Sequence, residues 1–179
     1  MYMKIFIEIS KGSNLKYEHD KETNSLMLDR IIHNTNTFPY NYGYIPNTLS
    51  PDGDPLDIII LCDYSLLPGC YADCKVIGGI ETEDECGKDD KILAVLADSL
   101  DPKSKLINDI ADINKVDFDN IIYFLKHYKD NELNKYINIG KIYDKQIALD
   151  VISKYSLSQW ISETWFTESS WVFISSITL

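Results

Sequence analysis

The order of apolar and polar residues along the 179-residue chain predicts short strands first and helices only later. Residues 3–8 and 16–18 mix apolar and polar side chains over short spans. The turn-forming residues 11–14 separate them, which predicts a β-hairpin or meander. Residues 25–30 form a third candidate strand. The uninterrupted apolar run 58–62 has the length of a strand and predicts one that is buried on both faces.

Two more strands are predicted at 74–80 and 91–96, where short apolar runs recur. The residues between them, 81–90, are rich in acids and predict a loop. Another segment, 39–44, contains Pro, Asn and Gly among its tyrosines, a composition that disfavours regular secondary structure. We therefore expect loops at 39–44 and 81–90.

Helical periodicity appears only in the later part of the chain. One apolar face recurs at a spacing of about 3.6 residues and consists of Ile121, Phe124, Leu125 and Tyr128. Asp117 and Asp119 stand near the start of this helix, where the helix dipole favours acids. A second helix is predicted over 144–155, with an apolar side made of Ile147, Val151 and Ile152 or Tyr155. Strands that precede helices indicate an α+β domain, a small β-barrel with helices packed outside it.

The composition is that of an ordinary globular protein, with 45% hydrophobic and 25% charged residues, and the length suits a single domain. Lysine and arginine number 17 against 28 acids, which gives a formal net charge of −11. Such an acidic protein repels nucleic acid and anionic lipid, so we expect neither as a partner. It also repels a polyanionic substrate, unless cations are bound between the two.

Localisation and redox state follow from what the sequence lacks. No apolar run reaches the roughly 18 residues that cross a membrane, and no signal stretch opens the sequence, so we expect a cytoplasmic protein without a membrane partner. The four cysteines, at 62, 70, 74 and 86, have no C-x-x-C spacing, and no histidine pair follows them, which disfavours a zinc site. We expect them to be free thiols, buried or half-buried.

The most informative stretch is 52–57, with the sequence DGDPLD, directly before the strand 58–62. Its glycine and proline favour a tight turn that brings Asp52, Asp54 and Asp57 together. Two carboxylates about 4 Å apart repel each other by roughly 4 kcal/mol at an effective dielectric constant of about 20, and divalent cations offset that repulsion. A solvated turn is the alternative. A calcium EF-hand loop is excluded, because its sixth position is Asp57 instead of glycine and a strand follows.

The acids within 81–90 form either a solvated loop or a second group of metal ligands at the same end of the fold. Side chains that could hold an anion are scattered along the chain: Lys16, Arg30, Tyr42, Tyr44, Tyr128 and Lys129. Each of them, taken alone, has a purely structural role as its alternative. The chain contains no P-loop, no G-x-S-x-G elbow and no G-x-G-x-x-G fingerprint, so P-loop nucleotide hydrolysis, acyl transfer and dinucleotide chemistry have no support.

Taken together, these motifs resemble those of the soluble inorganic pyrophosphatases of the bacterial type, family I. The resemblance covers about residues 3–160, and D-G-D-P-x-D is a specific signature of that family. The other matching segments are Glu8-Ile9, Lys16-Tyr17-Glu18, Asp29-Arg30, Asn41-Tyr42-Gly43-Tyr44 and His127-Tyr128-Lys129-Asp130. The resemblance implies a magnesium-dependent diphosphatase, which hydrolyses inorganic pyrophosphate to two orthophosphates through a metal-activated water, without a covalent intermediate.

The resemblance also implies roles for single residues. Asp54 resembles the general base that takes a proton from the attacking water. The implied ligands of Mg²⁺, several ions per active site, are Asp52, Asp57, Asp84, Asp89 and Glu8. The residues implied to bind the substrate are Lys16, Glu18, Arg30, Tyr42, Lys91, Tyr128 and Lys129. Cations that share a water can lower its pKa toward about 7, and they reconcile the acidic chain with an anionic substrate.

For the fold, the resemblance implies a five-stranded OB-like β-barrel with flanking C-terminal helices, assembled as a homohexamer. We expect a catalytic domain over 1–162 and an aromatic C-terminal extension over 163–179. The chain departs from the family at Phe38, where a tyrosine is usual, which removes a hydroxyl near the active site. Two alternatives remain: a barrel that binds a metal or an anion without catalysis, which Phe38 alone supports, and an oligonucleotide-binding barrel, which the acidic charge disfavours.

Overall fold

The computed structural model describes residues 2–20 and 22–157, and the predicted aromatic extension, 163–179, lies outside the described residues. The strands are β1 (Met3–Ile9), β2 (Leu15–Asp20), β3 (Ser25–Ile31), β4 (Asn41–Tyr44), β5 (Asp57–Leu61), β6 (Tyr71–Asp84), β7 (Gly87–Lys88), β8 (Lys91–Leu96) and β9 (Ile137–Asp144). The helices are the 3-10 turns η1 (Pro102–Leu106) and η2 (Ile110–Asp112) and the α-helices α1 (Lys115–His127) and α2 (Lys145–Tyr155).

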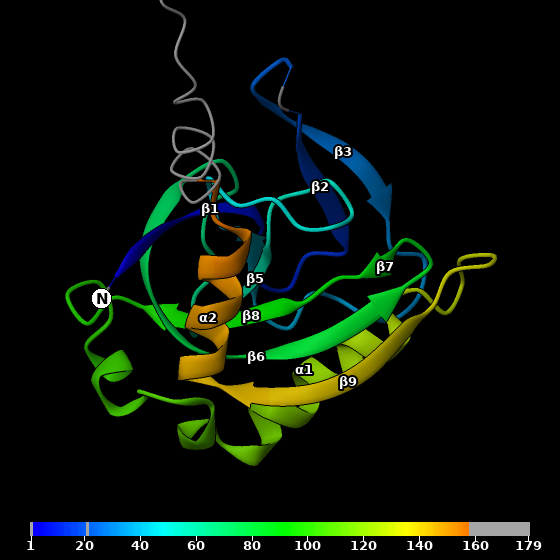
Figure 1. The fold of residues 1–179 in the computed structure, drawn as a ribbon. Coiled ribbons are helices and arrows are strands. Elements are labelled where there is room, and N and C mark those ends of the chain that lie inside the picture. The colour runs from blue at the N-terminus through cyan, green and yellow to red at the C-terminus, as the bar shows by residue number, and fades with distance from the viewer. Residues whose placement is uncertain (1, 21, 158–179) are drawn as a thin grey trace, which may run out of the picture.

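One mixed sheet forms the centre of the molecule (Figure 1). Its strands follow the order β1–β4–β5–β8–β6–β7, and β9 pairs with β6. Because β1 also pairs with β6, the path β1–β4–β5–β8–β6 returns to its first strand. β5 and β8 run parallel, whereas the other pairings of this sheet are antiparallel. A mixed sheet with two α-helices agrees with the predicted α+β class.

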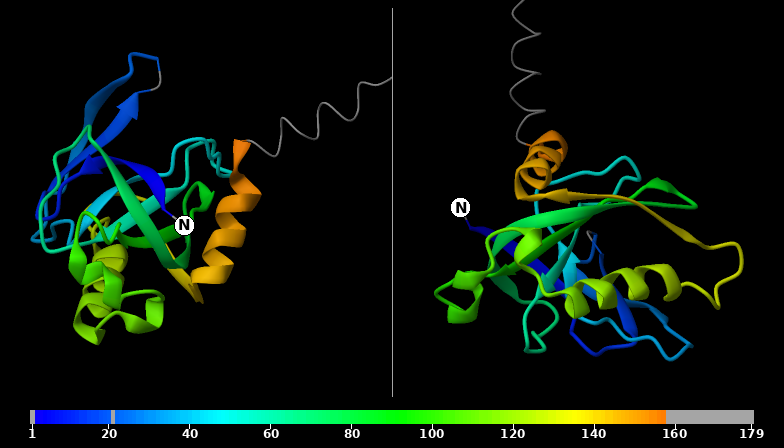
Figure 2. Two further views of the ribbon diagram at one scale, coloured as in Figure 1. Left: turned by 90° about the vertical axis from the view of Figure 1, so that its left-hand side faces the viewer. Right: turned by 90° about the horizontal axis from the view of Figure 1, so that it is seen from below.

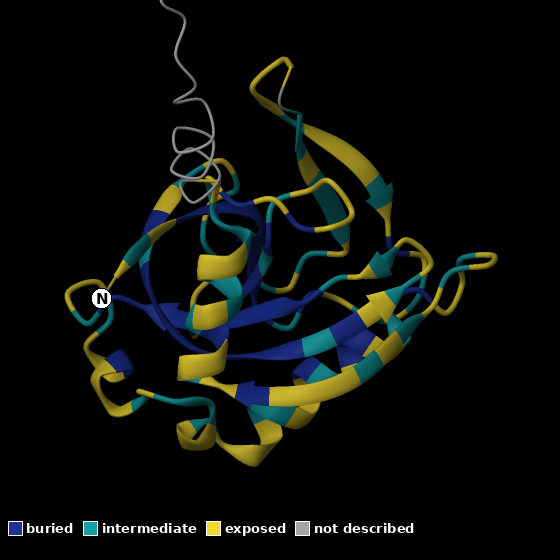
Figure 3. Cartoon of the chain, in the orientation of Figure 1, coloured by how far each residue is buried: buried dark blue, intermediate teal, exposed yellow. Residues whose placement is uncertain are grey.

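The two faces of β5 pack into two different hydrophobic clusters, as its apolar run predicts. Ile58 and Ile60 belong to a cluster that also contains side chains of β1, β6 and α2. Ile59 and Leu61 belong to a second cluster, which contains side chains of α1. Successive side chains of a strand point to opposite faces, so a strand between two clusters buries apolar side chains on both faces, here residues 58–61. The dark blue of β6 and β8 in Figure 3 shows the same burial on the neighbouring strands.

α1 covers the second cluster with the face that its periodicity predicts. Ile121, Phe124 and Leu125 are buried. Asn114 caps the first turn, since its side chain accepts a hydrogen bond from the backbone N–H of Asp117. The helix therefore starts and packs as the sequence indicates.

α2 packs on the first cluster and begins directly after Asp144, whose side chain accepts a hydrogen bond of 3.0 Å from the backbone N–H of Ile147. Its buried residue is Ala148, and Val151 and Ile152 are half-buried against the same cluster. Ile147, which we predicted on the apolar side, is exposed, because the contact face is centred one residue later. Among residues 2–20 and 22–157, no helix has both the length and the apolar character to cross a membrane.

Two predictions about the first strands are wrong. β1 and β2 do not form a hairpin; β2 pairs with β3 in a separate two-stranded sheet, and β1 pairs with β4 and β6. The segment 39–44 is not all loop, because it contains β4. A side chain at Gly43 would put its Cβ atom 1.9 Å from the carbonyl oxygen of Phe6 on β1, so this strand needs glycine for the close approach.

The acidic segment 81–90 is also more regular than predicted. β6 continues to Asp84, and a tight turn leads into β7 and then β8. β9, which the sequence analysis did not predict, pairs with this extended end of β6. The carboxylates of the segment are therefore held on paired strands and a short turn.

The β2–β3 hairpin stands apart from the main sheet (Figure 2). It is anchored on one side by Glu8 of β1, whose Oε1 accepts a hydrogen bond of 2.8 Å from the backbone N–H of His19. On the other side, Arg30 of β3 contacts Glu132, which follows α1. These contacts hold the hairpin as one wall of a cavity.

Candidate active site

A cavity of about 540 Å³ lies between the β2–β3 hairpin, the loop before β5, the β6–β7 turn and the end of α1. All thirteen residues to which the sequence analysis assigned a role line this cavity: Asp54; Glu8, Asp52, Asp57, Asp84 and Asp89; and Lys16, Glu18, Arg30, Tyr42, Lys91, Tyr128 and Lys129. The fold brings together residues that are more than 100 positions apart in the sequence, and their individual roles remain predictions.

The loop that carries Asp52 and Asp54 is closed by hydrogen bonds within itself. Oδ1 of Asp52 accepts a hydrogen bond of 3.0 Å from the backbone N–H of Asp54, and the N–H of Ser50 donates to the carbonyl of Asp54 over 2.7 Å. Gly53 has φ +93°, a backbone conformation that favours glycine. Both aspartates are exposed at the cavity wall, so Asp54 is accessible to solvent.

The base of this loop is joined to the end of α2. The backbone N–H of Leu49 donates to the carbonyl of Tyr155, and the N–H of Leu157 donates to the carbonyl of Asn47, both over 2.9 Å. Thr48, buried between them, accepts a hydrogen bond of 2.9 Å from the N–H of Leu56. The segment before the loop is therefore part of the packed structure.

Lys91 is the centre of the cavity floor. Its Nζ lies 2.5 Å from Oδ2 of Asp57 and 2.5 Å from Oδ2 of Asp89. Its side chain is only 2% exposed, and Tyr42 donates a hydrogen bond to the same oxygen of Asp57. Burial by itself would lower the pKa of Lys91, but the two carboxylates raise it above its ordinary value. One buried ammonium group thus joins two carboxylates.

Two acids of the cavity have strongly raised pKa values. Burial raises the pKa of Asp89 to about 6, although Lys91 opposes the shift. Burial also raises the pKa of Glu8 to about 8, although the hydrogen bond from His19 opposes it. Both carboxyl groups are therefore poorly stabilised as anions in the absence of a further cation.

The end of α1 supplies a second cation. Nζ of Lys129 lies 2.9 Å from Oδ2 of Asp84 and 3.3 Å from Oε2 of Glu85. Although burial opposes it, the pKa of Lys129 is raised by Tyr128 and by these acids. Burial raises the pKa of the Tyr128 phenol, so its hydroxyl stays protonated and can donate a hydrogen bond into the cavity.

The hairpin supplies the cations of the opposite wall. Lys16 contacts Glu18 on the same face of β2, as the i, i+2 spacing predicts, and its Nζ lies 3.2 Å from Oδ2 of Asp29. Nε of Arg30 lies 2.7 Å from the same carboxylate oxygen. The cavity therefore has cationic groups on two facing walls and carboxylates between them.

Comparison with known proteins identifies the family of this chain. The model of the inorganic pyrophosphatase family matches residues 5–160. This chain belongs to that family. The resemblance noted in the sequence is thus confirmed, over nearly all of the described residues.

Relatives of known sequence agree. The inorganic pyrophosphatase of Helicobacter pylori is 41% identical over 150 residues, which cover 84% of this chain and 87% of the relative. The inorganic pyrophosphatase of Saccharolobus solfataricus is 43% identical over 138 residues, which cover 77% of this chain and 80% of the relative.

Solved structures agree as well. The structure of the Helicobacter pylori inorganic pyrophosphatase matches with a TM-score of 0.86 and 38% identity, covering 89% of this chain and 94% of that chain. The inorganic pyrophosphatase of Thermus thermophilus matches with a TM-score of 0.84 and 33% identity, covering 89% of this chain and 91% of that chain.

Inorganic pyrophosphatases depend on metal ions, and the donors of this cavity suit a hard divalent cation because they are carboxylates. The raised pKa values of Glu8 and Asp89 mean that an added cation would stabilise their ionised forms. Within residues 2–20 and 22–157, however, no three His, Cys, Asp or Glu side chains are grouped to hold a metal ion as they stand. Asp57 and Asp89 turn toward Lys91 instead. The carboxylates are therefore suitable ligands by chemical type. A metal bound by Asp57 and Asp89 would replace Lys91 as their partner.

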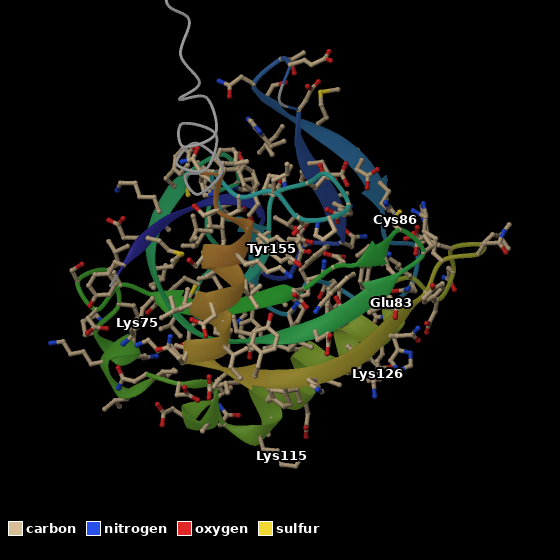
Figure 4. All side chains as sticks on the ribbon, in the orientation of Figure 1. Lys75, Glu83, Cys86, Lys115, Lys126 and Tyr155 are labelled. Atoms are coloured by element: carbon tan, nitrogen blue, oxygen red, sulfur yellow. The ribbon has the colours of Figure 1, made fainter. Side chains whose placement is uncertain are left out.

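Several residues that the sequence analysis did not assign also line the cavity, among them His19, Glu85, Cys86 and Lys135. Cys86 is exposed at the β6–β7 turn (Figure 4), which corrects the prediction of four buried or half-buried thiols. Glu85 belongs to the acidic run 81–90, whereas nothing local in the sequence marks Lys135 as a residue of the cavity.

Phe38 does not line the cavity. It is buried, and its ring packs on Tyr42, Phe124 and Tyr128, with ring centroids 5.4, 4.7 and 6.3 Å away. It supports two phenols of the cavity from behind, through ring packing alone.

Proposed function

We propose that this chain hydrolyses inorganic pyrophosphate to two orthophosphates in this cavity. The observation that carries the proposal is the gathering of all thirteen candidate residues, from distant parts of the sequence, around one space. Membership of the inorganic pyrophosphatase family supports the same reaction.

We propose that Mg²⁺ is the cofactor, with several ions per site held by Asp52, Asp57, Asp84, Asp89 and Glu8. Bound there, Mg²⁺ would lower the pKa of water and offset negative charge on the phosphates. The hard oxygen donors of these residues favour Mg²⁺ over softer metals.

Asp54 is the general base of this proposal. Its carboxylate takes the proton of the attacking water as the water oxygen forms a bond to one phosphorus, and the bond from that phosphorus to the bridging oxygen breaks. The leaving phosphate takes the electron pair, so no covalent bond to the protein forms. The exposed position of Asp54 on the cavity wall supports this role, because a base in contact with solvent can release the proton again.

The cations and phenols hold the substrate in this proposal. Lys16 and Arg30 contact one phosphate from the hairpin wall, with Glu18 fixing Lys16. On the facing wall, Lys91, Lys129, Tyr42 and Tyr128 bind the other phosphate. Preorganised donors of this kind stabilise the charge that develops on the leaving group, without reorganising during the reaction.

Four further proposals concern the whole molecule. The returning strand path supports a five-stranded OB-like barrel with flanking C-terminal helices. We propose a catalytic domain over 1–162 followed by the aromatic extension 163–179, a homohexamer as the assembled form, and the cytoplasm as its location.

A phosphate-release assay tests the function. The wild-type protein should release phosphate from pyrophosphate with Mg²⁺ and stop when EDTA is added. Asp54→Asn should lower kcat by about 10²- to 10⁴-fold, and Asp57→Asn should also abolish turnover. Asp150→Asn is the matched control, because Asp150 is exposed on α2, away from the cavity.

Absence of metal-dependent turnover in the wild type would contradict the proposal. Calorimetric binding of pyrophosphate without product would favour a non-catalytic ligand-binding domain, and a gel shift with single-stranded oligonucleotides would favour the nucleic-acid alternative.

A further inference from the structure

Lys135 is a cation of the cavity wall that the proposed reaction does not yet use. It lies in the turn between α1 and β9, where Asn134 has φ +60° and redirects the chain. Its Nζ is 3.3 Å from Oε2 of Glu132 and 3.9 Å from Oε1 of Glu85. The second distance exceeds that of a hydrogen bond, so one glutamate holds Lys135 firmly and the other only loosely.

The same two glutamates contact the cations on either side. Oε2 of Glu132 accepts a hydrogen bond from Arg30 of β3, 102 residues away in the sequence. Oε2 of Glu85 lies 3.3 Å from Nζ of Lys129. Charges therefore alternate in the order Arg30, Glu132, Lys135, Glu85 and Lys129 beside the cavity, and three segments contribute to this row: β3, the β6–β7 turn and the connection between α1 and β9.

The row is only partly exposed to water. The exposed fraction of the side chain is 34% for Lys135, 25% for Glu85 and 24% for Glu132. An exposed i, i+3 pair such as Glu132–Lys135 is usually a solvated surface contact of little consequence. Here Lys135 lines the cavity and its partner Glu132 is shared with Arg30, so the charge of Lys135 is less screened and can act on an anion inside.

We propose that Lys135 is a further phosphate-binding residue of this site and that Glu132 is a positioning residue, which holds Lys135 and Arg30 apart at the cavity wall. The proposal rests on the proposed function, because it assigns a further contact to the same substrate. Without Glu132, Arg30 and Lys135 would repel each other and point less consistently into the cavity. When a phosphate enters, Lys135 exchanges its loose contact with Glu85 for a phosphate oxygen.

Lys135→Met removes the charge and keeps most of the length of the aliphatic side chain. We expect it to raise KM for pyrophosphate about tenfold, the value of one hydrogen bond to a charged group, with kcat changed by less than about threefold. Lys135→Arg should keep KM within about threefold of the wild type. Lys126→Met is the matched control, because Lys126 is exposed on α1 (Figure 4) and its loss changes the net charge equally.

The direction of the change in KM for pyrophosphate in Glu132→Gln tests the positioning role of Glu132. Glu132→Gln removes a negative charge near the cavity, and by charge alone this would lower KM for an anion. The positioning role predicts the reverse, a rise in KM of about threefold to tenfold with little change in kcat. The effect should be smaller when Lys135→Met is already present, because Glu132 acts partly through Lys135.

Each result decides between explanations. Equal KM values for Lys135→Met and Lys126→Met would overturn the role of Lys135, and a lowered KM in Glu132→Gln would overturn that of Glu132. If the wild type shows no turnover, the proposed function fails first. Titration calorimetry of pyrophosphate with Mg²⁺ then measures the contact directly, and weaker binding by Lys135→Met than by Lys126→Met would still support it.

Discussion

Asp57 and Lys91 face each other as the first residue pair of the parallel strands β5 and β8, and Nζ of Lys91 lies 2.5 Å from the carboxylate of Asp57. Parallel strands that begin together place their first residues at the same edge of a sheet. The register of two buried strands thus fixes a lysine beside a carboxylate at the cavity floor.

Lys91→Met should therefore lower the stability of the protein even in the absence of substrate. It leaves the carboxylates of Asp57 and Asp89 facing each other without a cation, and we expect the free energy of unfolding to fall by roughly 2–4 kcal/mol. Urea denaturation with and without Mg²⁺ tests the cause, because the metal should stabilise the variant more than the wild type. Lys4→Met is the control, since it removes only an exposed pair with Asp73. Equal losses in both variants would contradict the prediction.

The metal-free protein should lose stability as pH rises from about 5 to about 8, because of the buried acid Glu8. Glu8 has a pKa of about 8 in the folded state, against an ordinary value of 4.5. The folded state then holds the proton more tightly than the unfolded state, so the stability from this group falls as pH rises between these two values. We expect a loss of roughly 2–4 kcal/mol between about pH 5 and pH 8.5, measured by urea denaturation in EDTA. Glu8→Gln should show a clearly flatter profile, and parallel profiles would refute the assignment.

The thiols should differ sharply in reactivity. Cys86 is exposed on the cavity wall, whereas Cys62 and Cys74 are buried, and burial raises the pKa of Cys74 to about 12. A chromogenic disulfide reagent should modify Cys86 first and inhibit turnover, and pyrophosphate with Ca²⁺ should slow the reaction. Cys86→Ser should remove this fast phase. A fast phase that persists in the variant would show that another thiol is accessible.

Gly43→Ala should destabilise the whole fold. The added Cβ would lie 1.9 Å from the carbonyl oxygen of Phe6, so β1 and β4 would have to separate. We expect a loss of about 2–3 kcal/mol in the free energy of unfolding. Gly140→Ala is the control, because the atoms nearest to its Cβ would belong to the side chain of Glu81, which can move. Similar losses in the two variants would mean that the approach of β1 and β4 is not tight.

Patterns within short stretches of sequence predicted the elements that depend on neighbouring residues, and missed those that depend on contacts with distant strands. The run 58–62 predicted a strand buried on both faces, and the apolar spacing over 144–155 predicted α2, because burial and helical periodicity leave a signature within a few residues. β4 was hidden because its glycine serves a contact with a distant strand. β9 was hidden because most of its residues are exposed, with Ile137 and Ile139 half-buried and Tyr143 buried, so no regular alternation marks it.

The same difference between local patterns and distant contacts applies to the candidate site. The acids at 52–57 were conspicuous because they are adjacent in the sequence, and the resemblance to a family supplied the scattered cations. Glu132 was missed, since it acts through Arg30, which tertiary folding brings to it, and Glu85 was seen only as one of the acids of 81–90, without its contact to Lys129. Lys91 could be named, but its shared contact with two acids depends on strand register.

The junction between α2 and the segment before the Asp52–Asp54 loop has a practical consequence. Two backbone hydrogen bonds join Tyr155, the last residue of α2, and Leu157, just after the helix, to residues 49 and 47 at the base of that loop. A purification handle or a surface attachment placed at the end of α2 would pull on this base directly. Tethering the protein there would transmit load to the loop that bears Asp54 without first deforming the sheet.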